Sequence, residues 1–395
     1  MRDWLCRAAV AAAIFAPLGP AAAQKNVALA PLPPYTAAYT PTTVDERGLW
    51  QQADEAERLL RDSPALIRDT ALNAYVRKVL CRAVGEDRCH AVRLYIMRVP
   101  AFNASMAPNG TMIVWTGLLL RVKNEAELAA VLGHEFGHFE LRHSLQSFRH
   151  RRTASDILSW TAVLAPRNMA ISASAVGMVF AYNRAQETEA DMMGLRYMKA
   201  AGYRSGEFSG IWERMMAEQD ASALGRKRTV THRYTAGFFA SHPTDMTRAA
   251  YLREAAGADA ELGVEGAHEY QAAMAKWLPE FLADQIKLND FGGSEYLLGQ
   301  LAGSDWSPEL LFARAELYRQ RGNPRDLISA ALFYQQAIDQ GCTDPAAWRG
   351  LGLSLIRSQQ PDAGRTALLA YIEHAPAAAD KAAMMMLIGQ QGNTK

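Results

Sequence analysis

The chain has 395 residues, of which 49% are hydrophobic and 21% are charged, and its formal net charge is +1. A chain of this length and apolar content can bury the cores of roughly two or three domains, which excludes disorder throughout. The balanced charge argues against a nucleic-acid-binding protein, because such proteins usually carry a marked positive excess. We therefore expect a folded protein with no nucleic-acid partner.

Residues 1–23 have the features of a cleaved signal peptide. Arg2 and Arg7 precede a short apolar run, and three alanines end at the expected cleavage site after Ala23. The run is too short for a membrane span, which needs about 20 residues, so an uncleaved anchor is the less favoured alternative. Residues 24–43 are rich in proline and are expected to form an extended linker. The mature chain should then lie in an oxidising compartment.

A first folded domain is predicted from residue 44 to residue 265. Apolar positions recur every three to four residues over Asp45–Leu60 and Ala71–Val84, which predicts two amphipathic helices. Cys81 and Cys89 are close in sequence, and in an exported chain we expect them to form a structural disulfide. Two buried free thiols are the alternative.

The apolar period then changes to two, which predicts β-strands. One strand is expected within Val92–Val99, and a second begins at Thr111. Asn109 and Gly110 lie between them and favour the positive φ angles of a tight hairpin turn. A small sheet is therefore expected ahead of the next helix.

The next helix, opened by Asn124 as N-cap with Glu127 in a capping box, carries the motif HEFGH. His134 and His138 are one helical turn apart, so both imidazoles can bind one metal ion. Glu135 lies beside them and can accept a proton from water at that ion. On a continuing helix, a histidine five residues further on would lie about 140° away, so His143 is expected to be structural.

The segment Ile157–Tyr182 is apolar but is interrupted by Pro166, so we expect a helical hairpin and no membrane span. Two interpretations remain open. The hairpin is either buried within the domain, or it is a lid that makes peripheral contact with a membrane or an apolar substrate.

The third metal ligand is expected on a later helix that contains the motif ETEAD. A catalytic zinc takes three protein ligands, and two histidines with one glutamate are a known set, so Glu187 is the candidate. Asp191 follows one turn later and is placed to accept the distal N–H of His134. Glu189 points the other way. The cofactor is therefore expected to be one Zn²⁺ per chain.

Three motifs, HEFGH, ETEAD and SHPTDMTR, together resemble those of the CAAX-prenyl-protease type of zinc metallopeptidases over about residues 44–255. The resemblance implies that Glu135 is the general base and Glu187 a zinc ligand. It also implies that a substrate pairs by β-augmentation with the strand before the HEFGH helix, formed by Met112, Ile113, Val114 and Trp115.

The same resemblance places His242 and Arg248 beside the active site. Two roles are open for His242: it donates a hydrogen bond to the oxyanion of the tetrahedral intermediate, or it occupies the fourth zinc position as a regulatory ligand. The regulatory role is favoured. Arg248 is expected to pair with a carboxylate or with a substrate carbonyl.

Residues 266–395 show helix pairs that repeat about every 34 residues. Trp348, Leu351, Gly352 and Leu355 fall at the spacing of a tetratricopeptide repeat, and a similar unit starts at Pro308. Such pairs stack and leave a concave surface for partners. A plain helical cap on the first domain is the alternative.

The sequence therefore predicts an α+β fold, with a mainly helical zincin-like metallopeptidase domain and small β-sheet, followed by an all-α tetratricopeptide-like domain. The predicted activity is zinc-dependent endopeptidase, and the alternative is a chaperone or scaffold that acts through the repeats with a latent zinc site. The order of the parts resembles periplasmic members of the family. That resemblance implies a periplasmic location, misfolded or stalled outer-membrane proteins as substrates, and contact with the outer-membrane assembly machinery through the repeats.

Overall fold

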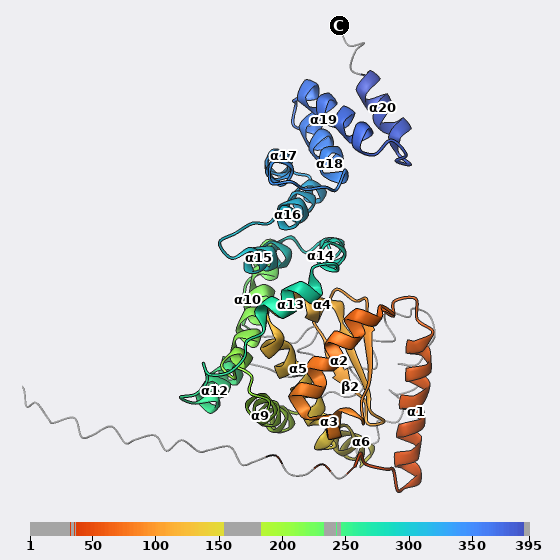
Figure 1. The fold of residues 1–395 in the computed structure, drawn as a ribbon, viewed down its shortest axis with the longest axis vertical. Helices are drawn as coiled ribbons and strands as arrows, with labels where there is room; N and C mark the ends of the chain where they lie inside the picture. Colours follow the sequence, from red (N-terminus) through yellow and green to blue (C-terminus); the bar gives the residue numbers. More distant parts are fainter. Residues whose placement is uncertain are drawn as a thin grey trace, which may run out of the picture. The chain divides into compact units, whose positions relative to one another are not determined.

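The structure is a computed structural model that describes residues 32, 35, 37–153, 183–232, 242 and 246–390 (Figure 1). The expected signal peptide, most of the expected linker and the apolar segment 157–182 lie outside the described residues. The described part is mostly helical with a small sheet, which agrees with the α+β class. None of its helices is long and apolar enough to cross a membrane.

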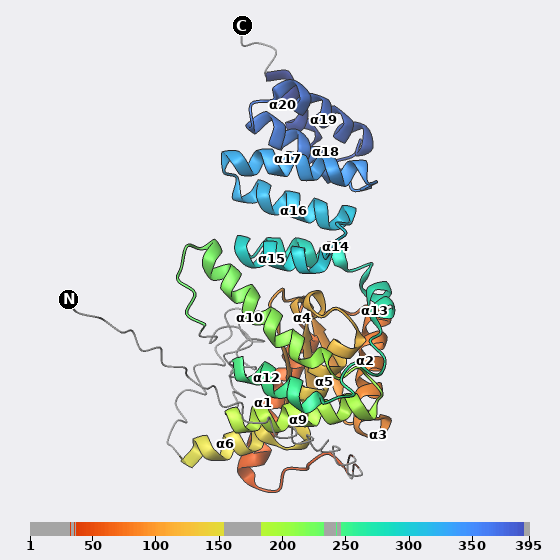
Figure 2. The same cartoon turned by 90° about the vertical axis from the view of Figure 1, so that its left-hand side faces the viewer.

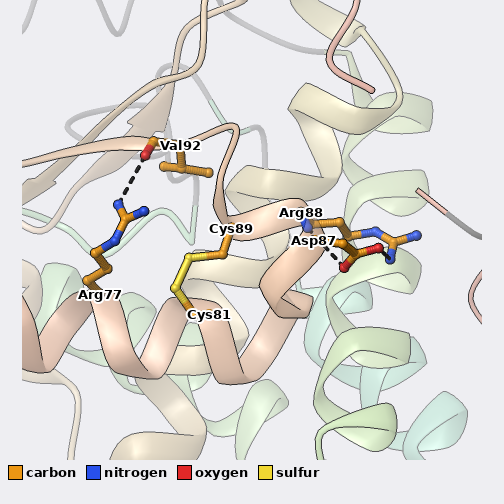
Figure 3. The surroundings of a disulfide bond; sticks show 6 residues. All are labelled: Arg77, Cys81, Asp87, Arg88, Cys89 and Val92. Atoms are coloured by element: carbon orange, nitrogen blue, oxygen red, sulfur yellow. Dashed lines mark hydrogen bonds and ion pairs between the residues drawn. A yellow bond between two sulfur atoms is a disulfide. The ribbon is translucent and has the colours of Figure 1, made fainter. Parts of the chain in front are cut away.

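Two helices open the fold close to their predicted positions. Helix α1 (Val44–Arg61) has Thr43 as N-cap in a reciprocal capping box with Glu46. Helix α2 (Thr70–Val84) is capped by Asp69 and leads into the short helix α3 (Glu86–Cys89). The predicted disulfide is present, and it joins Cys81 on α2 to Cys89 on α3 (Figure 3).

The sheet has three strands, β1 (Arg93–Met97), β2 (Ala104–Met106) and β3 (Thr111–Trp115), in the order β1-β3-β2. Strand β1 pairs with β3 in parallel, and β2 pairs with β3 antiparallel. The predicted hairpin between the first strand and β3 is therefore wrong. The turn at Asn109 and Gly110, where Gly110 has φ +93°, joins β3 to the short strand β2, which the sequence did not predict.

Helix α4 (Thr116–Arg121) follows the sheet and leads into the central helix α5 (Glu125–Glu140). Helix α5 is buried on every side from Glu125 to His138, as expected for a helix surrounded by protein. It packs against α9 (Arg184–Ala200) along glycines, and a Cβ on Gly137 would lie 3.1 Å from the carbonyl oxygen of Ala190. Helix α2 and strand β2 also pack against α5, as do α6 (His143–Thr153) and α10 (Glu207–Gly225), and α12 (Met246–Ala256) packs against α9.

The C-terminal part consists of successive helices (Figure 2). Helix α13 packs against α2 and α5, and the helices from α14 onward pack on their neighbours in sequence. They are α13 (Ala267–Met274), α14 (Leu278–Ile286), α15 (Phe291–Ala302), α16 (Pro308–Arg321), α17 (Pro324–Asp339), α18 (Ala346–Arg357), α19 (Pro361–His374) and α20 (Lys381–Gln390). The pairs α16–α17 and α18–α19 occupy the two units that the sequence favoured, and they share an apolar cluster around Tyr334 and Leu351. Their assignment as tetratricopeptide repeats stays a prediction.

Candidate metal centre

Helix α5 places His134, Glu135 and His138 in the interior of the protein, where all three side chains are fully buried. The helix begins as predicted, because the Asn124 side chain accepts from the backbone N–H of Glu127. The expected capping box is incomplete. In a complete box the Glu127 carboxylate would accept from the N–H of the N-cap, Asn124. It accepts instead from the N–H of Lys123, and it also pairs with Arg214 of α10.

Helix α9 brings two acidic side chains to the same place. The Asp191 carboxylate lies 2.8 Å from Nδ1 of His134, so that nitrogen donates its hydrogen and leaves Nε2 as the free lone pair. Glu187, one turn earlier on α9, lies 3.3 Å from Nε2 of His138 through its Oε1. The structure thus brings together His134, His138, Glu187 and Asp191 as the sequence spacing suggested.

His242 completes a buried cluster of four potential ligands with His134, His138 and Glu187. Its Nδ1 is 3.0 Å from Oε1 of Glu187 and 3.4 Å from Nε2 of His134, and the two Nε2 atoms of His134 and His138 are 3.0 Å apart. Ligand atoms around a tetrahedral zinc with bonds of about 2.1 Å are separated by about 3.4 Å. The spacing and the donor types therefore fit zinc.

The charge states of His134, His138 and Glu187 also suit a cation. Burial lowers the pKa of His134 and His138 and keeps these imidazoles neutral, as metal ligands must be. Burial opposes ionisation of Glu187, but the positive charges of His242 and Arg248 outweigh it and hold the pKa well below the usual range. Asp191 behaves likewise, and its pKa falls to about 2 beside Arg248.

Arg248 lies behind the cluster, where it binds the carboxylates. It donates two hydrogen bonds of 2.7 Å to Asp191, lies 2.9 Å from Oε2 of Glu187, and stacks over the ring of Trp212. Tyr251 donates a further hydrogen bond to Asp191. Of the two roles that the sequence left open for Arg248, the contacts favour pairing with carboxylates over contact with substrate.

Glu135 differs from the other acids in its surroundings. Neither of its carboxylate oxygens has a hydrogen-bond partner among the described residues, and its closest charged neighbour is Nε2 of His242 at 3.5 Å. Burial raises the pKa of Glu135 to about 8, and a cation in the cluster would lower it again. A buried, unsatisfied carboxylate beside a ligand cluster is suited to hold and deprotonate a water molecule.

His143 does not continue α5, although the sequence argument assumed that it did. Helix α5 ends at Glu140, Arg142 adopts φ +60°, and α6 begins at His143. This turn brings Nδ1 of His143 to 2.9 Å from Nδ1 of His138, while Nε2 of His143 lies 3.0 Å from Oε2 of Glu189. Helical spacing could not show these two contacts, because they depend on a reversal of the chain.

The proposed substrate strand needs a correction. Strand β3, which contains Met112, Ile113, Val114 and Trp115, is the central strand and is paired on both sides. A peptide cannot add to a strand whose two edges are occupied. The two edge strands are β1 and β2. The outer side of β1 already bonds to the backbone of residues 65–67, whereas β2 packs against α5.

The disulfide lies beside Arg88 (Figure 3). Arg88, next to Cys89 on α3, pairs with Glu140 at the last position of α5. Tyr197 of α9 donates a hydrogen bond to the same carboxylate. By closing the corner between α2 and α3, the disulfide helps to hold Arg88 against the end of α5.

Comparison with known proteins agrees with this geometry. Residues 67–256 match the model of Peptidase family M48. The chain is 30% identical over 184 residues to the mitochondrial metalloendopeptidase OMA1 of Schizosaccharomyces pombe, which covers 46% of this chain and 52% of the relative. It is 31% identical over 158 residues to the metalloprotease YcaL of Escherichia coli, a match that covers 38% of this chain and 57% of that relative. It is 22% identical over 245 residues to the beta-barrel assembly-enhancing protease of Escherichia coli, a match that covers 58% of this chain and 48% of that relative.

The chain thus spans about half of the length of these curated relatives. The fold, the buried ligand cluster and the family match together indicate a metallopeptidase domain over residues 67–256. This part of the chain is similar to peptidase family M48.

Proposed function

We propose that the chain is a zinc-dependent endopeptidase that cleaves misfolded or stalled proteins in the periplasm. The observation that carries the proposal is the buried set of His134, His138 and Glu187 next to the unsatisfied carboxylate of Glu135. Two of the relatives are named metalloendopeptidase and metalloprotease, in agreement with this chemistry.

Each residue has a distinct part in the proposed reaction. His134, His138 and Glu187 hold the metal, and a zinc ion there would polarise the scissile carbonyl and acidify water. Glu135 takes the proton of the attacking water and returns it to the leaving amine. Asp191 and Arg248 keep His134 and Glu187 in place.

We infer that an extended substrate pairs with the edge strand β2. Asn103 accepts a backbone hydrogen bond from Trp115 of β3, and Ala107 donates one to Thr111, so in an antiparallel ladder the backbone groups of Ala104 and Met106 point away from β3. Those groups are the ones that a peptide would bind by β-augmentation. This assignment replaces the strand that contains Met112 to Trp115.

The location and the clients are supported by sequence features and by a relative. The features of residues 1–23 and the disulfide suit export to the periplasm. One relative is named a beta-barrel assembly-enhancing protease, which supports outer-membrane proteins as clients. The C-terminal helix pairs would then bind clients or the outer-membrane assembly machinery.

Metal content and turnover of purified variants test the proposal. We expect about one zinc per chain, and a chelator should abolish cleavage of an unstructured peptide. His134→Ala, His138→Ala and Glu187→Ala should each lower the zinc content. Glu135→Gln should retain the zinc and lose turnover. Full activity of Glu135→Gln would refute the assigned mechanism.

Clients can be captured with the same Glu135→Gln protein and identified by mass spectrometry. If the inactive protein supports assembly of outer-membrane proteins as well as the active one, the chain acts as a chaperone with a latent zinc site. The intact, buried Glu135 favours the enzyme.

A further inference from the structure

Two residues outside the ligand cluster form a chain of contacts that ends on a metal ligand. His143 is fully buried, and its Nδ1 lies 2.9 Å from Nδ1 of His138. Its other ring nitrogen, Nε2, lies 3.0 Å from the carboxylate of Glu189 on α9. The Glu189 side chain is 60% exposed, so the chain of contacts runs from the surface to the cluster.

The hydrogens in this chain can be assigned from donor and acceptor chemistry. An ionised carboxylate only accepts, so Nε2 of His143 carries the hydrogen that Glu189 binds. Two nitrogens 2.9 Å apart share one hydrogen, which lies on Nδ1 of either His143 or His138. A hydrogen on Nδ1 of His143 would leave His138 with its own hydrogen on Nε2, the atom that faces the cluster.

We propose that Glu189 and His143 are positioning residues that fix the tautomer of His138. In this arrangement His138 donates from Nδ1 to His143, and its Nε2 lone pair faces the metal. The inference rests on the proposed metal site, and it extends that site by two residues on α9 and α6.

The contacts from Glu189 through His143 to His138 have a counterpart at His134, the other ligand histidine. Asp191 orients His134 directly, whereas Glu189 orients His138 through His143. Glu187, which lies between them in the motif, faces the cluster itself. Each of the three acids of ETEAD therefore acts on the same metal position in a different way.

The two residues should contribute unequally. His143 is buried and contacts the ligand, so its loss removes the acceptor that it offers to Nδ1 of His138. Glu189 is largely exposed, and water can replace part of its hydrogen bond. Loss of a group that orients a metal-ligating histidine typically lowers metal affinity about 10–100-fold.

The test measures the zinc dissociation constant of the full chain by competition with a chromophoric chelator. His143→Leu should weaken zinc binding about 10–100-fold, because leucine accepts no hydrogen bond. His143→Gln should stay within a few-fold of the unsubstituted protein, because its amide oxygen can accept from His138. Glu189→Leu should weaken binding more than Glu213→Leu, a control that removes a partly exposed acid paired with Arg253 on α12.

The relative zinc affinities of His143→Leu and His143→Gln distinguish a role in orienting His138 from simple packing. If His143 only filled space, buried leucine would be tolerated better than glutamine. The proposal is wrong if His143→Leu binds zinc as tightly as the unsubstituted protein, or if His143→Gln binds zinc more weakly than His143→Leu. If His143→Leu does not fold, equal affinity of Glu189→Leu and Glu213→Leu overturns it. Absence of zinc binding in the unsubstituted protein would instead refute the proposed function.

Discussion

His242 lies next to both the metal ligands and Glu135, the general base that we propose. Its Nδ1 lies in the ligand cluster, and its Nε2 faces Glu135 at 3.5 Å. A histidine that fills the fourth position of a zinc excludes water from it. These contacts support the regulatory role more than the role of an oxyanion donor.

Replacement of His242 distinguishes the two roles. His242→Ala should retain zinc, because His134, His138 and Glu187 remain, and it should raise kcat/KM for small unstructured peptides. An increase of about tenfold is expected if the closed form outnumbers the open one by about ten to one. His374→Ala, a change on α19, is the control. A loss of about a hundredfold at unchanged zinc content would show that His242 stabilises the transition state.

Helical periodicity was sufficient to predict most of the site residues. The i, i+4 spacing of His134 and His138, and of Glu187 and Asp191, agrees with the distances in the structure. The contact of Glu189 with His143 was not predictable, because it needs the left-handed turn at Arg142 and the packing of α6 against α9. His242 was placed only by family resemblance, since a residue in a loop carries no periodic signal.

At the scale of elements, Glu57 joins α1 to the sheet. Its carboxylate accepts two hydrogen bonds of 2.7 Å from Arg93 and one of 2.7 Å from Tyr95, both on β1. Asn109, in the turn between β2 and β3, also donates to it. One buried carboxylate thus fixes the helix against two parts of the sheet.

The pH dependence of stability should show this contact. The hydrogen bonds from Arg93 lower the pKa of Glu57 to about 2, below its value in the unfolded chain. The stabilisation is therefore present above about pH 4.5 and is lost as the pH falls towards 2. Because the Arg93 side chain is 46% exposed, we expect about 1–2 kcal/mol, less than the full shift implies.

Urea unfolding of the zinc-free protein measures this contribution. At pH 7, Glu57→Gln should lower the free energy of unfolding by that amount. The difference between Glu57→Gln and the unsubstituted protein should shrink as the pH is lowered from 4.5 to 2.5. A difference that stays constant over this range would contradict the assignment.

The sheet shows what strand patterns can and cannot predict. Alternation of apolar residues located β1 and β3, but it contains no information on strand direction. Asn109 and Gly110 do form a tight turn, but the turn joins β3 to β2 and not to β1. Strand β2 has only three residues, too few for an alternating pattern to be recognised. The helices α1, α2 and α5 were predictable because their patterns are long and their caps are local.

At the scale of the whole chain, helix α14 and the segment just before α13 make polar contacts with the domain over residues 67–256. Arg121 of α4 donates two hydrogen bonds to Glu218 of α10 and one of 2.9 Å to Gln285 of α14. The α5 helix depends on the same region, because the N–H groups of Glu125 and Ala126 donate to the carbonyls of Gly266 and Glu265. These bonds satisfy two of the free donors at the start of the metal-binding helix.

The predicted boundary at residue 265 can therefore be compared with a boundary at Gly303, after α15. A chain that ends at Gly263 loses both α5 contacts, the pairing of Tyr203 with Val264, and the buried side chains of Phe281, Leu282 and Ile286. Each large apolar side chain contributes about 1.5–3 kcal/mol, so their sum approaches the 5–15 kcal/mol net stability of a typical domain.

We expect the chain that ends at Gly303 to fold, to bind zinc within a few-fold of the full chain, and to cleave small unstructured peptides. The chain that ends at Gly263 should unfold at a much lower temperature and lose zinc binding, because the start of α5 is no longer held. Thermal unfolding and zinc competition on both truncated chains measure this difference. Capture of an unfolded client should fall in both, since both lack α16 to α20. If the chain that ends at Gly263 binds zinc as well as the full chain, helices α13 to α15 are separable from the metal-binding unit and the boundary lies at residue 265.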